Sequence, residues 1–474
     1  LKNGIKINEN YATAYINLGN VYAALDKLDD SLNCYEKAML INSDLDGLLG
    51  RVLSTKINLC SWDAIDSLLI DAKEKIIMND NVIDPWGLMG LFDNLFLQKQ
   101  VTELYMNNEY PISDNLPLLN RHPKHPKIRI GYFSADFREH PVGYLTAELY
   151  ELHDRDHFEI HAFSFGPDTK DVLNLRIKAG VDHFHDVENM SDKEIAILAR
   201  SLEIDIAIDL VGHTANSRTK IFAISAAPLQ VSYLGYPGTM GSNFYDYLIA
   251  DQTIIPENSK QYYSEKIAYL PDTYFVSDSK NKFSKRIFTK EELNLPENAI
   301  VFCCFNNYYK ISQASFSSWM RIMSKVERSV LWIPYGNTSA IRNLKKEANM
   351  MGVDENRLVF SDHLVLIEDH FSRLKLADLF LDTHPYNAHT TCSDALRVGV
   401  PVMTYLGESF ASRVAGSLLK ALNLPELITS TPEEYEALAI ELATHPEKLK
   451  VIKEKLASNL STAPLFDTKR FTKN

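Results

Sequence analysis

The sequence of 474 residues is long enough for about three domains of ordinary size, each with its own hydrophobic core. Hydrophobic residues make up 45% of it and charged residues 23%, which is typical of a globular protein and excludes disordered, collagen-like and low-complexity classes. The formal net charge of −13 argues against binding to nucleic acid or to an anionic membrane through bulk electrostatics. No stretch approaches the roughly 18 uninterrupted apolar residues of a spanning helix, so the sequence predicts a soluble protein.

The five cysteines are sparse and lack the C-x-x-C spacing, so they indicate neither a disulfide framework nor a zinc site. A reducing compartment fits this usage best, and we expect a cytoplasmic location. The sequence opens on Leu1 and closes on Asn474, and we expect both ends to have been cut from a longer protein.

Residues 12–41 have the pattern of two short amphipathic helices. Six residues match the slots of a tetratricopeptide unit of roughly 34 residues: Tyr15, Leu18, Gly19, Tyr22, Tyr35 and Ala38. The small Gly19 and Ser31 would let the helices pack closely, and Leu1 and Gly4 would belong to the preceding repeat. We assign residues 1–46 to a truncated repeat array; a generic helical hairpin is the alternative.

Residues 47–126 mix helix and loop and are predicted to form a helical connector, with Trp62 and Trp86 in its core. From residue 127 strands and helices alternate, which predicts a parallel sheet covered by helices. The expected strands are Ile128–Ser134, Phe158–Phe165, Asp205–Val211, Leu229–Leu234 and Tyr245–Ala250. Ser191 and Glu194 form a capping pair before a helix over 192–202. We assign residues 127–286 to a first α/β domain.

After a segment rich in Lys and Ser (277–286), a second series of strands begins. Its expected members are Ile300–Phe305, Ser329–Pro334, Arg357–Phe360, Leu379–Asp382 and Val402–Leu406. Residues 287–474 are therefore assigned to a second α/β domain. Because ligands of such sheets bind at the carboxyl ends of the strands, the chemistry is expected in loops that follow strands.

The strongest chemical signal follows the strand 379–382. The loop 383–394 contains His389, Thr390 and Thr391 and opens a helix over 395–398. Free backbone N–H groups and the positive end of the helix dipole would suit a phosphate, and Asp394 could accept a hydrogen bond from a ribose. An ordinary N-cap with polar neighbours is the alternative.

Three weaker signals also follow strands. Lys310, just after the strand 300–305, could reach a leaving phosphate, although most lysines are simply solvated. His140 and His213 follow two strands of the first domain and are candidates for a general base, with a structural role as the alternative. The turn 234–239 contains glycines that permit close approach of a ligand, or it is only a turn. No dinucleotide, P-loop, nucleophile-elbow or H-E-x-x-H motif is present.

Taken together, these motifs closely resemble those of the O-GlcNAc transferase and SPINDLY-like family of protein glycosyltransferases. The segments that carry the resemblance, in chain order, are 136–141, 212–214, 227–230, 234–239, 263–266, 305–310, 381–383, 389–391 and 407–414. The resemblance implies an α/β fold: a helical tetratricopeptide N-terminus followed by two Rossmann-like lobes, the GT-B glycosyltransferase fold.

The resemblance also implies an inverting, metal-independent transfer of GlcNAc from UDP-GlcNAc to Ser or Thr of protein acceptors. No cofactor is implied, and the UDP-sugar is the donor substrate. The implied catalytic residues are His140, His213 and Lys310, with no metal ligand. The implied substrate-binding residues are Gly235, Tyr236, Asn307, His370, Arg373, His389, Thr390, Thr391 and Asp394. Within this set, Lys310 would neutralise the diphosphate, and His370 with Arg373 would flank the uracil.

The implied partners are the nucleotide sugar and protein or peptide acceptors held in a tetratricopeptide groove, with no nucleic acid and no membrane. Ile367 stands where metazoan members carry a lysine, and the long metazoan insert between the lobes is missing, as in bacterial relatives. Two alternatives stay open. The same fold could use GDP-fucose, or glucose onto asparagine, or the chain could be an idle repeat scaffold, against which the joint presence of Lys310 and 389–391 speaks.

Overall fold

The structure, a computed structural model, describes residues 10–111, 119, 124–281, 283–362, 364 and 366–474. The chain forms two compact units, neither of which is continuous in sequence. The first contains residues 1–101, 283–419 and 424–457, and the second contains residues 102–282, 420–423 and 458–474. Among the described residues, no helix is long and apolar enough to cross a membrane.

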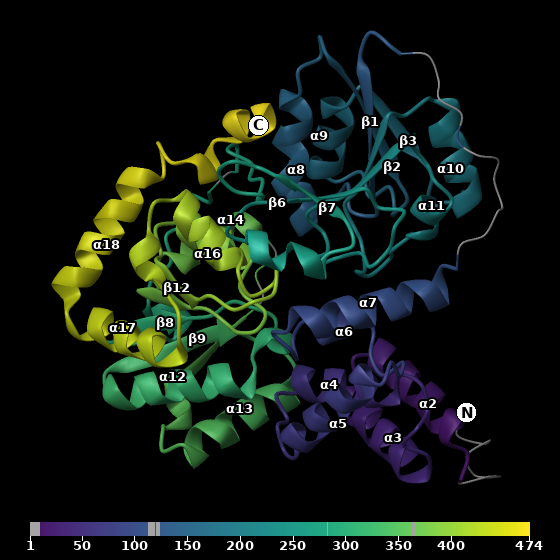
Figure 1. Ribbon diagram of the computed structural model, residues 1–474. Coiled ribbons are helices and arrows are strands. Elements are labelled where there is room, and N and C mark those ends of the chain that lie inside the picture. Colours follow the sequence, from purple (N-terminus) through teal and green to yellow (C-terminus); the bar gives the residue numbers. More distant parts are fainter. Residues whose placement is uncertain (1–9, 112–118, 120–123, 282, 363, 365) are drawn as a thin grey trace. The chain divides into compact units, whose positions relative to one another are not determined.

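The second unit is built on a seven-stranded parallel sheet with the order β3-β2-β1-β4-β5-β6-β7. Its strands are β1 (Ile128–Ser134), β2 (Phe158–Ser164), β3 (His183–Asp186), β4 (Ile206–Asp209), β5 (Leu229–Ser232), β6 (Tyr247–Ala250) and β7 (Lys266–Tyr269). Its helices are α8 (Pro141–Leu152), α9 (Val172–Gly180), α10 (Asp192–Ser201), α11 (Lys220–Ala223) and α19 (Thr468–Lys473). Figure 1 shows α8 and α9 on one side of the sheet and α10 and α11 on the other.

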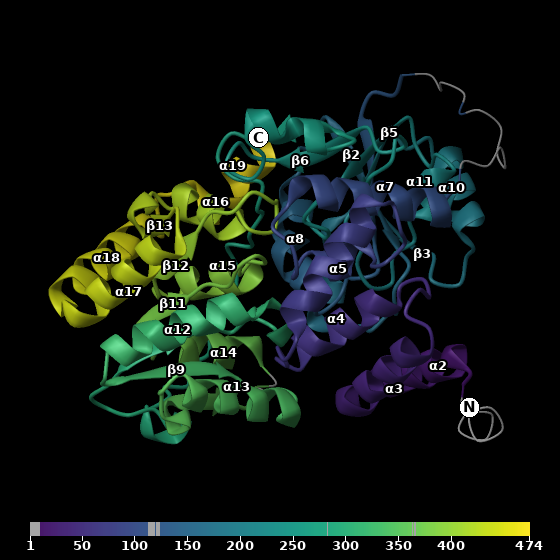
Figure 2. The same ribbon diagram turned by 60° about the horizontal axis from the view of Figure 1, so that its bottom comes forward.

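The first unit contains a six-stranded parallel sheet with the order β10-β9-β8-β11-β12-β13. Its strands are β8 (Ile300–Cys303), β9 (Ser329–Pro334), β10 (Leu358–Ser361), β11 (Leu379–Leu381), β12 (Val402–Tyr405) and β13 (Ile428–Thr429). The helices of this part are α12 (Gln313–Lys325), α13 (Thr338–Met350), α14 (Ile367–Leu374), α15 (Thr390–Arg397), α16 (Val414–Ala421), α17 (Pro432–Thr444) and α18 (Pro446–Asn459). Figure 2 shows α12 and α13 close to β9.

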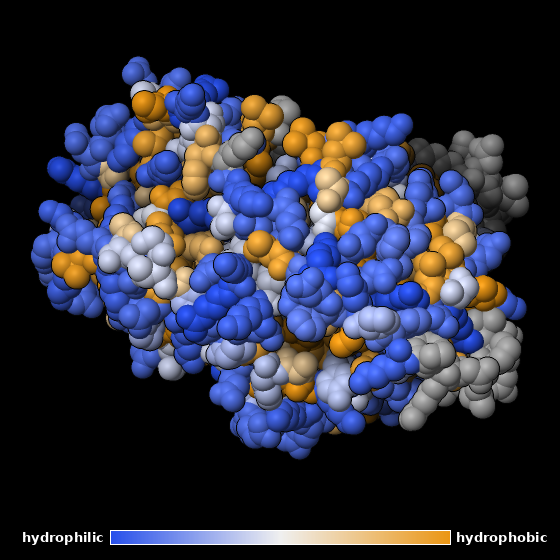
Figure 3. All heavy atoms as spheres, turned by 90° about the horizontal axis from the view of Figure 1, so that it is seen from above, coloured by the Kyte–Doolittle hydropathy of each residue, from blue (hydrophilic) through white to orange (hydrophobic). Residues whose placement is uncertain are grey.

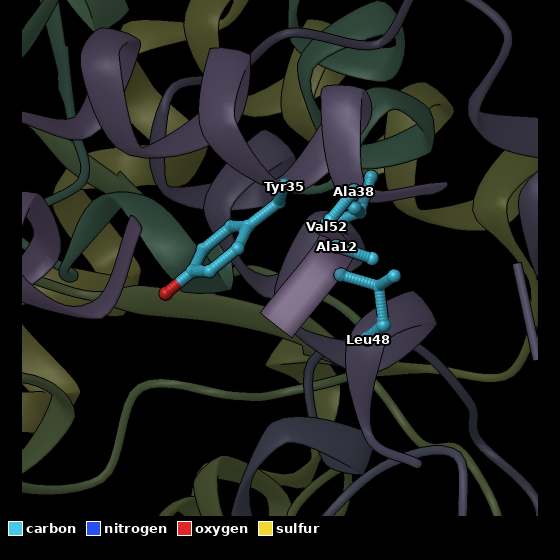
Figure 4. Close-up of a cluster of buried hydrophobic side chains, with 5 residues drawn as sticks. All are labelled: Ala12, Tyr35, Ala38, Leu48 and Val52. Carbon is cyan, nitrogen blue, oxygen red and sulfur yellow. The ribbon is translucent and has the colours of Figure 1, made fainter. Parts of the chain in front are cut away.

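The same unit includes the helical N-terminal part of the chain. It comprises α2 (Ala12–Ala24), α3 (Leu28–Ile41), α4 (Leu48–Asn58), α5 (Ile65–Ile77) and α6 (Pro85–Leu88), followed by α7 (Leu95–Glu109), which runs into the second unit. Apolar side chains of α2, α3 and α4 form one cluster (Figure 4), and it contains Ala12, Tyr35, Ala38, Leu48 and Val52. The repeat-like hairpin therefore shares its core with the connector.

The predicted close packing of α2 against α3 is confirmed. A Cβ atom added at Gly19 would lie 2.5 Å from Cε1 of Tyr35, so a larger residue would push the helices apart. The Ser31 hydroxyl donates to the Gly19 carbonyl across the pair at 2.9 Å. The preceding repeat predicted at Leu1 and Gly4 lies outside the described residues.

The predicted fold class, α/β with two Rossmann-like lobes behind a helical N-terminus, is confirmed. Each predicted strand is present, several of them one to three residues shorter, and the capping box of Ser191 and Glu194 forms at the start of α10. The predicted start of the helix after β11 is wrong, because α15 begins at Thr390, five residues before the predicted 395. The loop 383–394 is thus shorter than expected, and both Thr390 and Thr391 lie in the first helical turn.

The tail of the chain belongs to the second unit. The Ser277 hydroxyl donates to the Leu465 carbonyl at 2.6 Å, and the Thr468 hydroxyl donates to the Ser277 carbonyl at 2.7 Å. Arg470 forms a two-pronged ion pair with Asp272. Residues from 458 onward therefore complete the unit that begins at residue 102.

The face drawn in Figure 3 is mostly hydrophilic, with small scattered apolar groups, which is ordinary for a protein surface.

Candidate active site

The polar loops after β8 and β11 are joined by side-chain hydrogen bonds. These two strands are neighbours in the first unit's sheet, so their carboxyl ends open at the same edge. The Asn306 amide donates to the Thr383 hydroxyl at 2.7 Å, and the Asn306 oxygen accepts a hydrogen bond from the Thr391 hydroxyl. Asn306, which lies in the predicted segment 305–310 but was assigned no role there, therefore connects the β8 loop, the β11 loop and the first turn of α15.

Lys310 is buried beside these loops, at the end of a short 3-10 turn. Its Nζ donates to the Asn387 carbonyl at 2.9 Å and lies 3.9 Å from the centroid of the Tyr386 ring. Burial lowers the pKa of Lys310 to about 7, against the opposing attraction of Asp382. The ammonium form is therefore undersolvated, and an anion brought next to it would be held strongly.

Asp382 fixes the shape of the loop that follows β11. Its carboxyl group accepts hydrogen bonds from the backbone N–H of Thr383 at 2.8 Å and of Ala388 at 2.6 Å, and from the Thr404 hydroxyl at 2.8 Å. Burial raises the pKa of Asp382 to about 7, although these hydrogen bonds and Lys310 favour the anion. Three donors on one buried carboxyl group make this loop rigid.

Three predicted site residues lie at the start of α15. Thr390 and Thr391 lie in its first turn, where backbone N–H groups have no partner within the helix. His389 is the residue before the helix, and its Nε2 lies 3.2 Å from the Ala411 carbonyl. Because that nitrogen donates, Nδ1 of the neutral ring is an acceptor; burial also holds the pKa of His389 well below its usual value. Asp394, half-buried one turn further on, has its pKa raised to about 7 by burial.

His370 and Arg373 lie one turn apart on α14 and form one group beside the Phe305 ring. The Arg373 Nε donates to His370 Nδ1 at 3.2 Å. The guanidinium carbon of Arg373 lies 5.3 Å from the Phe305 ring centroid, and the His370 ring centroid lies 5.0 Å from that centroid. Burial lowers the pKa of Arg373 to about 10, so it stays charged at neutral pH. The structure thus brings these two residues together, whereas Asn307, at the start of the Lys310 turn, is exposed.

Asp93, in the connector, holds the loop between β12 and α16, a role that the sequence analysis missed. Its carboxylate accepts the backbone N–H groups of Glu408 and Ser409, each at 2.8 Å, and the Ser412 hydroxyl at 2.7 Å. A Cβ at position 407 would lie 2.1 Å from the Asp93 carboxylate, so only glycine fits there. No local signal could reveal this, because these partners are more than 300 residues away in sequence.

The second unit carries the two candidate bases in segments that follow neighbouring strands, since β1 pairs with β4. His140 caps α8: its Nδ1 accepts from the Val142 N–H at 3.3 Å and lies 3.5 Å from the Asp136 carboxylate. Burial lowers the pKa of the half-buried His140, with Asp136 opposing that effect. In the neutral ring the capping contact places the proton on Nε2.

His213 is buried in the turn after β4. Its Nε2 donates to the Met240 carbonyl at 3.1 Å, and burial lowers its pKa to about 4. The rings of Tyr105 and Tyr236 meet it nearly edge-on, with centroid distances of 5.5 and 4.9 Å. His213 is therefore neutral at physiological pH, with Nδ1 unprotonated, which is the state that a general base requires.

The glycine-containing turn beside His213 is dictated by packing. A Cβ at Gly235 would lie 2.0 Å from the Leu210 carbonyl, and one at Gly212 would lie 2.5 Å from Cβ of Tyr236. Asp209 accepts hydrogen bonds from the Gly212 N–H at 3.1 Å and from the Tyr245 hydroxyl at 2.6 Å. Asp209 therefore shapes the turn that carries His213.

Comparisons with known proteins identify a matching family and several similar proteins. The model of glycosyl transferase family 41 matches residues 114–290 and 284–474. A protein of Arabidopsis thaliana named "Probable UDP-N-acetylglucosamine--peptide N-acetylglucosaminyltransferase SEC" is 36% identical over 73% of this chain and 36% of its own length. The UDP-N-acetylglucosamine–peptide N-acetylglucosaminyltransferase of Caenorhabditis elegans is 29% identical over 73% of this chain and 40% of its own.

Among solved structures, a point mutant of the Thermobaculum terrenum O-GlcNAc transferase superposes with a TM-score of 0.80 at 25% identity. The match covers 99% of this chain and 90% of that one. The present chain spans less than half the length of the two curated relatives named above.

Proposed function

The chain belongs to glycosyl transferase family 41, and on this premise we propose that it moves GlcNAc from UDP-GlcNAc to Ser or Thr hydroxyls of protein acceptors. The transfer proceeds with inversion and without a metal. The observation that carries the proposal is the buried Lys310 beside the first turn of α15, in a loop network tied together by Asn306.

The proposed donor site lies at the carboxyl edge of the first unit's sheet. The first-turn N–H groups of α15, with the Thr390 hydroxyl, bind the diphosphate oxygens, while the Thr391 hydroxyl donates to Asn306. Lys310 neutralises charge as it grows on the departing UDP. Arg373 and His370 flank the uracil, and Asp394 accepts from the ribose. These groups supply the positive potential that other transferases obtain from a divalent cation.

In the proposed transfer, the acceptor hydroxyl oxygen bonds to the anomeric carbon while the bond from that carbon to the phosphate oxygen breaks. The hydroxyl proton leaves to a general base, for which His140 and His213 are the candidates, and UDP departs with the bonding electrons. A single displacement of this kind inverts the anomeric centre. Gly235 and Tyr236 would face the sugar and the acceptor.

Calorimetry of UDP binding tests the donor site. We expect UDP to bind equally well with a chelator and with added magnesium. Strict dependence on magnesium would contradict the proposal. A hydrolysis screen with UDP-GlcNAc, UDP-glucose and GDP-fucose then identifies the sugar, with UDP-GlcNAc expected to turn over fastest.

The repeat hairpin is proposed to guide extended peptide acceptors, as tetratricopeptide arrays offer a concave groove. Removal of residues 1–43 should lower protein glycosylation more than hydrolysis of the donor by water. The deletion also uncovers Leu48 and Val52, so both rates are to be compared on a preparation whose melting shows it to be folded. Equal loss of the two activities in a folded sample would assign the hairpin a structural role only.

A cytoplasmic location is part of the same proposal. All five cysteines are buried and none is in a disulfide, which suits a reducing compartment.

A further inference from the structure

A cluster of imidazole and carboxylate groups lies on one face of β2 and β3, away from the proposed transfer residues. Glu159 and His161 are two residues apart on β2 and so share a face, and His161 is paired in register with His183 on the edge strand β3. All three belong to the second unit. They lie near the amino ends of their strands, whereas His140 and His213 follow carboxyl ends.

The three side chains converge on one point. One oxygen of Glu159 lies 3.3 Å from His161 Nε2 and 2.9 Å from His183 Nε2, and one potential ligand atom from each residue lies within 4.8 Å of the others. Zinc bonds to His nitrogen and carboxylate oxygen are about 2.0–2.2 Å long, so ligand atoms around a tetrahedral ion are about 3.3 Å apart. The 3.3 and 2.9 Å distances already approach that spacing.

Neighbouring groups orient the cluster. The Nδ1 of His161 lies 3.1 Å from Nε2 of His185, and the second oxygen of Glu159 lies 3.3 Å from Nε of Arg129. The ring of His161 is 3% exposed and packs against those of His183 and His185. Metal-binding histidines generally donate their other N–H to such a partner, which fixes the ring and the tautomer. His161 could thus present Nε2 to an ion while Nδ1–H donates to His185.

We propose that Glu159, His161 and His183 bind a divalent transition metal, zinc by preference, as a site separate from the transferase chemistry. Two histidine nitrogens with one carboxylate oxygen are a ligand set that suits zinc, whereas magnesium and calcium favour oxygen ligands. The side chain of His183 is half exposed, so water can complete the coordination. The ion would pin the edge strand β3 to β2.

The test uses the full chain, stripped with a chelator and dialysed. We expect calorimetry to show one equivalent of bound zinc, cobalt to give the visible bands of tetrahedral coordination, and zinc to raise the melting temperature. His183→Gln should weaken zinc binding by at least about tenfold, as loss of even a supporting group costs that much. Because His161→Gln changes a buried residue, the half-exposed His183 provides the safer variant.

The matched control is His157→Gln, which removes an exposed histidine just before β2 and should leave zinc binding unchanged. UDP binding should be the same in all variants, with or without zinc. Absence of zinc binding, or equal binding by wild type and His183→Gln, would overturn the proposal. A failure of UDP to bind would count against the proposed transferase activity and not against the metal site.

Discussion

The candidate residues of the two units are held in different ways. In the first unit, Asn306 joins two loops and a helix through side chains. In the second unit, His140 and His213 are each held by nearby backbone, the N–H of Val142 and the carbonyl of Met240. The first arrangement fixes several loops at once and suits an anchor for a polyanion. The second orients single rings and leaves each one neutral, which suits proton transfer.

Replacing the histidines of the second unit should have the largest effect. A general base typically contributes about 10²–10⁴ in rate, so we expect His213→Ala or His140→Ala to lower transfer within that range. The affinity for UDP should stay near the wild-type value, because neither side chain belongs to the unit that carries the proposed donor site.

Transfer rates and UDP calorimetry on the same preparations check this expectation, with the exposed His445→Ala as the control. Near-normal rates in both variants would mean that the proton leaves through another group or through water. A parallel loss of UDP affinity would contradict the assignment of donor binding to the first unit and of proton transfer to the second.

Lys310→Met tests the anchor of the first unit. We expect turnover to fall by roughly 10²-fold or more and UDP affinity to fall less, because charge on the departing diphosphate grows in the transition state. The exposed Lys325→Met, at the end of α12, is the matched control. A loss confined to affinity would assign Lys310 to binding in the ground state.

Asp93→Ala tests whether a residue of the connector supports the proposed donor site by holding the loop after β12. Hydrogen bonds to a charged group contribute about 1.5–3 kcal/mol each, so freeing the loop after β12 should weaken UDP binding about tenfold through displaced Ala411 and His389. The control Asp71→Ala removes a half-exposed carboxylate of α5 whose ion pair with Lys75 is a weak surface contact. Unchanged UDP affinity in a stable Asp93→Ala protein would restrict its role to folding.

The smallest effect concerns pH. Lys310, with a pKa of about 7, is half protonated near pH 7, and bound diphosphate favours its protonated form. Binding therefore takes up a proton, and UDP affinity should fall about fivefold from pH 7 to pH 8, as linkage for one such group requires. Ionisation of Asp382, whose pKa is also about 7, acts in the same direction, because its anion repels the diphosphate. Calorimetry in buffers of different ionisation enthalpy measures the uptake, and Lys310→Met should weaken this dependence.

The sequence predicted those helices and strands that have strong local patterns. Polar contacts between residues far apart in the sequence could not be predicted from it. Strand alternation predicted ten of the thirteen strands in the described residues but not β3, β7 or β13, and the Ser191 capping box predicted α10. The edge strand β3 was missed because its sequence, His-Phe-His-Asp, is mostly polar. Asp93 resembled any acidic residue of a loop, since its partners come from the opposite end of the chain.

For the proposed donor site, the sequence indicated the residues but not the contacts that hold them. Lys310, Thr391 and His389 were predicted as site residues because they follow strands; the structure brings them to one sheet edge, and their role in donor binding stays a prediction. The bonds that hold them, from Asn306 and Asp382, depend on which strands are neighbours, and a single sequence does not specify that order. The charge states likewise follow from burial, which spacing alone does not reveal.

The return of residues 458–474 to the second unit has a consequence for biosynthesis. A ribosome makes the sheet β1 to β7 long before α19, yet the hydroxyl and carbonyl of Ser277 and the carboxylate of Asp272 await partners from 465–470. The helices of residues 12–88 emerge still earlier and must wait for β8 and later strands to share their unit. Because domains generally fold as units during synthesis, the nascent protein passes through a stage in which both units are open. Neither unit can be produced as a single uninterrupted fragment. If residues 1–282 and 283–474 were expressed as two separate chains, the two fragments would have to associate before either unit was complete.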